Sequence, residues 1–294
     1  MTTPNFESAT ALVAAPSRAA TVEGETALKE LGFAHVWQAG SLAQGHKLLR
    51  ETAFDLLVLD SVWPDGNVND LLTAIRHGEA GGNPFLGIVI FGADRNGSDV
   101  GFIMRHGADD FVTLPLAAVN LLKSLEQLTK ARLPFVVTSD YVGPDRRAGE
   151  GRKSLIPLIE VPNSLRDKTA GTYEANAMAR AVAKTMNEIN IEKLQRHVEK
   201  VGTLINRVGP DMMVDGVDEK VRTFLEELVF VADDIARRVK GTHFDAIVAS
   251  CGRLVSVAKI VHKRTGVPST KELNQLLDAA QAVMKGFAAA ALGG

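Results

Sequence analysis

The sequence predicts an α/β domain followed by an all-α domain, that is, a doubly wound parallel sheet and then an antiparallel helical bundle. Three observations predict this. Short apolar runs alternate with amphipathic stretches up to residue 131, residues 133–171 contain many prolines, glycines and arginines, and long helical periodicities begin at about residue 172. We therefore expect a first domain over 1–132, a linker or ordered extension over 133–171, and a helical bundle over 172–294.

The first region contains five short apolar runs that predict strands: Ala11–Ala14, Ala34–Trp37, Leu56–Leu59, Ile88–Phe91 and Asp110–Thr113. Apolar strands separated by helices imply a parallel sheet that is covered on both faces. Gly32, Gly78 and Gly107 fall where the intervening helices should stop, since glycine tolerates a left-handed cap. Five strands and five helices in this order are typical of the flavodoxin-like fold.

Beyond residue 172 the apolar residues recur with helical spacing. Their faces predict helices over 191–208, 221–239, 244–261 and 273–287, with an extra helix at Tyr173–Met186. Gly209 and Pro210 should end the first of the four. Long helices with short connections favour an antiparallel bundle. In the extension, Phe135–Val137 could add a strand.

The charge balance excludes some classes of function. The chain has 33 basic and 35 acidic residues, a formal net charge of -2, so nothing global favours nucleic acid or an anionic membrane. Cys251 is the single cysteine, which rules out a disulfide within one chain and fits a reducing, cytoplasmic location. No apolar run is long enough to span a bilayer, so we expect no membrane insertion.

Asp60 stands at the end of the run Leu56–Leu59 and precedes Trp63-Pro-Asp65-Gly. Open α/β sheets place their chemistry at this edge, where the strands end. This segment, and the region over residues 9–131, resembles the receiver domains of two-component systems. The resemblance implies that Asp60 is the phosphoacceptor and that magnesium is needed only if Asp60 is phosphorylated. Asp65 is close enough in sequence to contribute to a rearranged metal site.

Most of the supporting chemistry of receivers is missing from this chain. The resemblance places the acidic pair that holds the metal at Ala15 and Pro16, which cannot coordinate a cation. Where receivers carry a hydroxyl residue after the fourth strand, the resemblance places Gly92. Where they carry a lysine before a proline after the fifth strand, it places Leu114. Several such losses would slow phosphoryl transfer by orders of magnitude. The sequence therefore favours a degenerate receiver, or pseudo-receiver, with no metal site.

The helical half contains two weaker signals. The segment 231–241 resembles histidine phosphotransfer domains, but the position expected for their histidine is Asp233. His197 is the other candidate, because histidine nitrogens accept phosphate from kinases. Its charged neighbours predict a surface position on a helix, for which no function is required.

The extension carries clustered arginines, Arg146, Arg147 and Arg152. Guanidinium groups fork onto phosphates and stack on purines, and the cluster resembles arginine-rich sites for cyclic di-GMP. A solvated basic linker is the alternative. Stacking surfaces could come from Trp37, Trp63 and Tyr141.

The residues favour a protein without enzymatic activity, because no phosphate-binding loop, zinc-protease motif or hydrolase nucleophile motif is present. The leading hypothesis is a two-component signalling adaptor that acts through protein contacts. The resemblance implies a histidine kinase or phosphorelay partner contacting residues 98–131, while the bundle would bind or dimerise through an exposed apolar stripe. The alternatives are a response regulator switched at Asp60 and a cyclic di-GMP effector. DNA binding is disfavoured because the helices are long and balanced in charge.

Overall fold

A computed structural model describes residues 4–93, 98–147 and 156–293 of the chain. It divides into two compact units, Met1–Ile189 and Asn190–Gly294. No helix among the described residues is long and apolar enough to cross a membrane. Each unit is described separately below.

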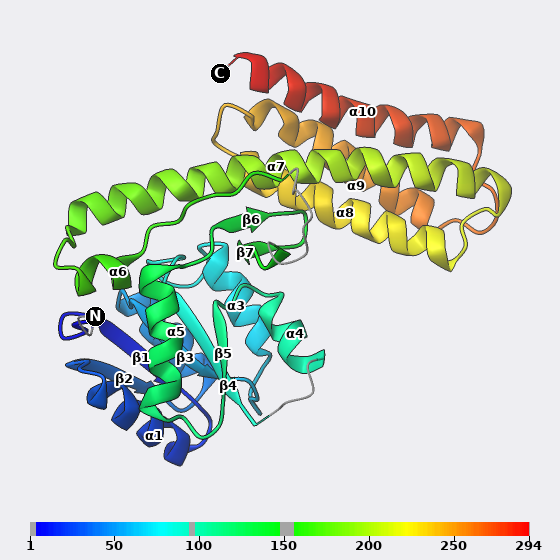
Figure 1. Cartoon of the computed structure of the whole chain (residues 1–294). Helices are drawn as coiled ribbons and strands as arrows, with labels where there is room; N and C mark the ends of the chain where they lie inside the picture. The colour runs from blue at the N-terminus through cyan, green and yellow to red at the C-terminus, as the bar shows by residue number, and fades with distance from the viewer. Residues whose placement is uncertain (1–3, 94–97, 148–155, 294) are drawn as a thin grey trace. The chain divides into compact units, whose positions relative to one another are not determined.

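The first unit is built on a parallel sheet of strand order β2-β1-β3-β4-β5 (Figure 1). This order is that of the flavodoxin-like fold, so the predicted fold class is confirmed, as is the helical region that follows. The predicted strands differ from the observed ones by two residues at most. The strands are β1 (Thr10–Ala14), β2 (His35–Ala39), β3 (Leu56–Asp60), β4 (Gly87–Gly92) and β5 (Asp110–Thr113).

Both faces of the sheet are covered by helices. Side chains of α1 and α5 form one core layer with the sheet, and those of α2, α3 and α4 form the other. Gly32, Gly78 and Gly107 all have positive φ angles after these helices, as predicted. The helices are α1 (Arg18–Glu30), α2 (Leu42–Glu51), α3 (Val68–Arg76), α4 (Ser98–Met104) and α5 (Ala118–Lys130).

The extension after α5 is ordered where it is described. It contains the predicted strand β6 (Phe135–Val137), which pairs with β7 (Val142–Pro144) as an antiparallel hairpin, and the short helix α6 (Ser164–Thr169). A Cβ on Gly143 would lie 2.8 Å from the Cα of Gly107. The hairpin therefore approaches the sheet so closely that two glycines must meet there.

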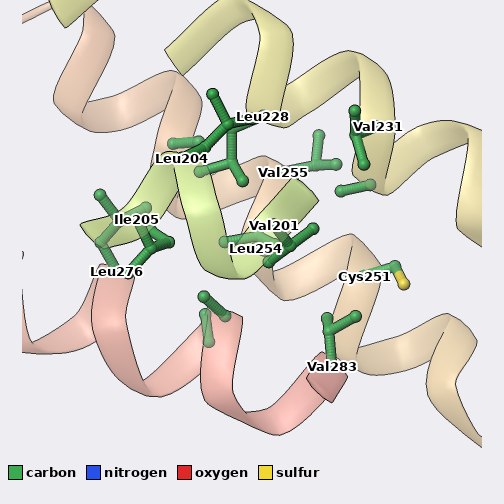
Figure 2. Packing of buried hydrophobic residues seen from close by; sticks show 14 of the residues in the cluster. Val201, Leu204, Ile205, Leu228, Val231, Cys251, Leu254, Val255, Leu276 and Val283 are labelled. Carbon is green, nitrogen blue, oxygen red and sulfur yellow. The ribbon is translucent and has the colours of Figure 1, made fainter. Parts of the chain in front are cut away.

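The second unit is a bundle formed by the later part of α7 (Ala175–Val214) with α8 (Glu219–Val239), α9 (Val248–His262) and α10 (Thr270–Gly293). Figure 2 shows how their apolar side chains meet in one core. Asp218 caps α8 by accepting from Val221 N at 2.7 Å. Ser269 and Glu272 form a reciprocal capping box at the start of α10, which fixes its first turn.

Two details of the helix prediction are wrong. Tyr173–Met186 is not a separate helix, because α7 runs unbroken from Ala175 to Val214. Pro210 also lies inside α7 and does not end it. A proline inside a helix costs about 3 kcal/mol, but Val208 and Met212 on either side are buried in the bundle core. Tertiary packing outweighs the local penalty.

Candidate functional site

Asp60 is the last residue of β3, at the carboxyl edge of the sheet. Its carboxylate accepts a hydrogen bond from Val62 N at 3.0 Å, and Trp63 Nε1 donates to its carbonyl oxygen at 2.8 Å. Burial raises the pKa of Asp60, and the backbone amides of Val62 and Ser61 oppose that rise only in part. The position is therefore as predicted, but a half-buried carboxylate held by amides has little electrostatic support.

The neighbouring residues do not fit a magnesium ion. Ala15 is fully buried in the apolar core. Asp65 does not turn toward Asp60 as a second ligand, because its Oδ2 accepts from Leu42 N at 3.0 Å at the start of α2. No group of three or more histidine, cysteine or acidic residues that could hold a metal occurs in the described parts of the chain. Hard cations need several oxygen ligands, and the described residues of this edge do not assemble them.

The space beside β4 is filled in a way that the sequence did not reveal. A Cβ placed on Gly92 would lie 2.3 Å from Ser61 Oγ and 3.5 Å from the Phe111 ring. A threonine or serine would therefore require the Ser61 side chain to move. Ser61 puts a hydroxyl where Gly92 lacks one. Nothing local in the sequence indicates this, since Ser61 follows β3 and Gly92 ends β4.

A cavity of about 390 Å³ lies beside this edge. Its lining includes Ser61, Trp63, Asn69 and Phe102, and none of its described lining residues is charged. Trp63 is buried, so it packs in the core and offers no free stacking face. The described residues of the cavity provide no counter-charge for a phosphoryl group.

The described arginines of the extension, Arg146 and Arg147, form hydrogen bonds within the first unit and do not extend into solvent with free guanidinium groups. Arg146 donates to Met104 O at 3.0 Å and also to Ala108 O. Its guanidinium contacts Tyr141 Oη at 3.2 Å. Arg147 Nε donates to Asp145 Oδ1 at 2.8 Å, while Arg152 lies outside the described residues. Among the described residues, Tyr141 is the one predicted stacking residue that contacts an arginine of this segment.

A buried charge network fastens this extension to the sheet. Asp109 accepts from Arg76 at 2.8 Å and from Arg132 at 2.9 Å. Both guanidinium groups lie over the ring of Phe135 in β6, at 5.1 and 5.4 Å from its centroid. Burial lowers the pKa of Arg76 to about 10, and Asp109 limits the fall. Arg76 remains charged at neutral pH, so the network is ionic.

The expectation of a surface His197 is wrong. Its side chain is fully buried between helices, and its Nε2 lies 2.8 Å from Asp234 Oδ2. Arg238 Nε donates to the same carboxylate at 2.6 Å. Burial alone would raise the pKa of Asp234, but the hydrogen bonds from His197 and Arg238 lower it far below its usual value. A kinase could not reach this histidine without opening the bundle. Asp233, which precedes Asp234 in the sequence, is exposed.

No protein-family model matches the chain, and no curated protein matches it. Solved structures do. A CheY-like response regulator receiver from Methanospirillum hungatei has 18% identity and a TM-score of 0.36, over 41% of this chain and 93% of that one. CheY4 of Vibrio cholerae has 17% identity and a TM-score of 0.37, over 41% and 98%. The response regulator RcsB of Salmonella typhimurium has 12% identity and a TM-score of 0.37, over 92% and 99%.

These are likenesses to receiver domains and response regulators. The assignment of the sheet to the flavodoxin-like class is based on its strand order and not on them.

Proposed function

We propose that this protein is a non-enzymatic adaptor in two-component signalling, in which a pseudo-receiver acts through protein contacts and the bundle supplies a second contact or dimerisation surface. One observation carries the proposal. The edge around Asp60 assembles no metal-ligand cluster from described residues, and no ion pair to Asp60 is found among them. Phosphoryl transfer depends on such charges, so the fold is retained without its chemistry.

The link to two-component signalling comes from the resemblance of residues 9–131 to receivers and from the strand order of the sheet. A histidine kinase or another phosphorelay component is the class of partner that this resemblance implies. Large apolar side chains exposed on the second unit support a contact role for the bundle. They are Ile191, Met213, Val214, Phe230, Ile260 and Val267.

The test is phosphorylation of the full chain. We expect no phosphate adduct in intact-mass spectra after incubation with acetyl phosphate and magnesium, because the described residues give Asp60 neither a metal site nor a cation beside it. Asp60→Asn, which cannot form the acyl phosphate, is the matched control, and a receiver with a complete site is the positive control. An adduct in the wild type that is absent from Asp60→Asn would overturn the proposal and favour the response regulator switched at Asp60.

A further inference from the structure

A groove runs between α4 and the β6–β7 hairpin of the first unit; both elements are labelled in Figure 1. Its volume is about 800 Å³. Phe102 and Met104 of α4 line one side, and Tyr141 and Pro144 line the other. Phe102 is 55% exposed, so more than half of its surface is open to a partner. The groove therefore offers an apolar floor that no described residue covers fully.

The two walls are held in place by the molecule's own contacts. Arg146 connects them, because it reaches from the hairpin to the carbonyl oxygens of Met104 and Ala108. Phe102 meets the His106 ring edge-on with centroids 5.0 Å apart, and His106 Nδ1 lies 2.9 Å from Phe102 O. A groove with fixed walls binds without a large ordering cost.

The rim of this groove is positively charged. Arg105, Arg146 and Arg147 all line it, and Asp140 is the one carboxylate among its described lining residues. Arg147 is paired with Asp145, so Arg105 and Arg146 carry the positive charge of the rim. Arg105 is exposed and has no side-chain partner in the described parts of the chain. Arg146 is bonded to carbonyl oxygens, so those contacts leave its charge uncompensated. The rim therefore favours negative charge beside an apolar anchor.

We propose that this groove binds an acidic amphipathic helix of a partner protein. A large apolar side chain of the helix packs against Phe102, and its carboxylates face Arg105 and the neighbouring rim. This rests on the proposed adaptor function and specifies the chemistry of the partner. A dinucleotide fits less well, because phosphate binding needs free guanidinium forks and the donors of Arg146 are already used by main-chain oxygens.

The probe is a fluorescein-labelled helical peptide of about 20 residues, with leucine and phenylalanine on one face and glutamate on the other, titrated with the full chain. We expect a rise in fluorescence anisotropy that weakens at high salt and is absent for the same peptide with lysine in place of glutamate. Phe102→Ser should weaken binding about tenfold or more. Arg105→Glu should weaken it roughly fivefold. The matched controls Val119→Ser and Arg50→Glu, exposed on other elements, should remain within about twofold.

Three results would overturn the proposal: no binding at about 100 µM protein, binding that Phe102→Ser leaves unchanged, or Arg105-dependent displacement of the peptide by cyclic di-GMP. The last would assign the groove to a nucleotide. Circular dichroism of each variant identifies loss of folding. Peptide binding together with a phosphate adduct at Asp60 would overturn the adaptor function and support the groove as a binding site. If neither binding nor an adduct were found, the groove proposal would fail and the adaptor function would stand.

Discussion

Strand β3 is flanked by two aspartates whose surroundings differ in kind. Asp55, just before the strand, is buried and accepts from Thr10 N and from Lys168 Nζ, both at 2.7 Å. Asp60, at the other end, accepts hydrogen bonds from backbone amides, and no described residue forms an ion pair with it. Burial raises its pKa. The amino edge supplies counter-charge where a carboxylate is buried, and the described residues of the carboxyl edge do not.

Asp109, which precedes β5, extends the comparison along the amino edge. Its side chain is 4% exposed, and its Oδ2 also accepts from Ile88 N at 2.8 Å. Burial alone would raise the pKa of Asp109, but Arg132 and Arg76 outweigh it and lower the pKa below its usual value. Charge at this edge is structural, because it attaches the hairpin through Phe135.

The largest effect should come from Asp109→Ala. Removing this carboxylate leaves two buried guanidinium groups without their counter-ion, which costs about 3–5 kcal/mol of unfolding free energy. Urea unfolding followed by tryptophan fluorescence measures it, since both tryptophans, Trp37 and Trp63, lie in the first unit.

The effect of Asp109→Ala also has a defined pH dependence. Because the pKa of Asp109 is lowered in the folded state, its stabilisation is present above the unfolded value and is lost as the pH falls through the folded one. The difference in unfolding free energy between wild type and variant should therefore become smaller in acid. Glu30→Ala, at an exposed position on α1, should change stability by no more than about 0.5 kcal/mol. A loss below about 1 kcal/mol for Asp109→Ala would contradict a structural role for the charge.

A smaller effect is expected at Asp55, whose partner Lys168 is 16% exposed at the side chain. Asp55→Asn keeps an acceptor for Thr10 N but removes the charge. A double-mutant cycle with Lys168→Met should give a coupling energy of about 1–2 kcal/mol. The cycle for the exposed pair Lys130 and Glu126 should give no more than about 0.5 kcal/mol. Equal coupling in the two cycles would mean that burial does not strengthen the Asp55 pair.

The fold was predictable because its determinants are local. A run such as Leu56–Leu59 is apolar on both faces, and the glycines after the helices adopt positive φ. It could also be read directly that Ala15 and Leu114 supply neither a metal ligand nor a cation. The hydrogen bonds that hold Asp65 and Arg146 could not be read in this way, because their partners, Leu42 N and Met104 O, are 23 and 42 residues away.

The bundle shows the same limit of local patterns. His197 is flanked by charged residues in sequence, yet it faces inward because α8 presents Asp234 and Arg238 to it. A helical pattern gives the face of one helix but not the chemistry of the face opposite. The groove residues Phe102 and Arg105 were missed for a related reason. Phe102 on α4 and Arg105 just after it look ordinary in the sequence until the hairpin supplies the second wall.

The smallest effect, and the sharpest test of the comparison, is Asp60→Asn. Because burial raises the pKa of Asp60, the folded state favours the protonated carboxyl, and wild-type stability falls as the pH rises from the unfolded pKa through the folded one. Asparagine can still accept from Val62 N without this penalty. We expect the unfolding free energy of Asp60→Asn to exceed that of the wild type by less than about 1 kcal/mol at neutral pH, because solvent screens a half-exposed group. The gain should disappear toward the unfolded pKa of aspartate, about 3.9. Urea unfolding across this range measures it. A loss at neutral pH would reveal a stabilising partner for Asp60, and the two ends of β3 would then follow the same rule.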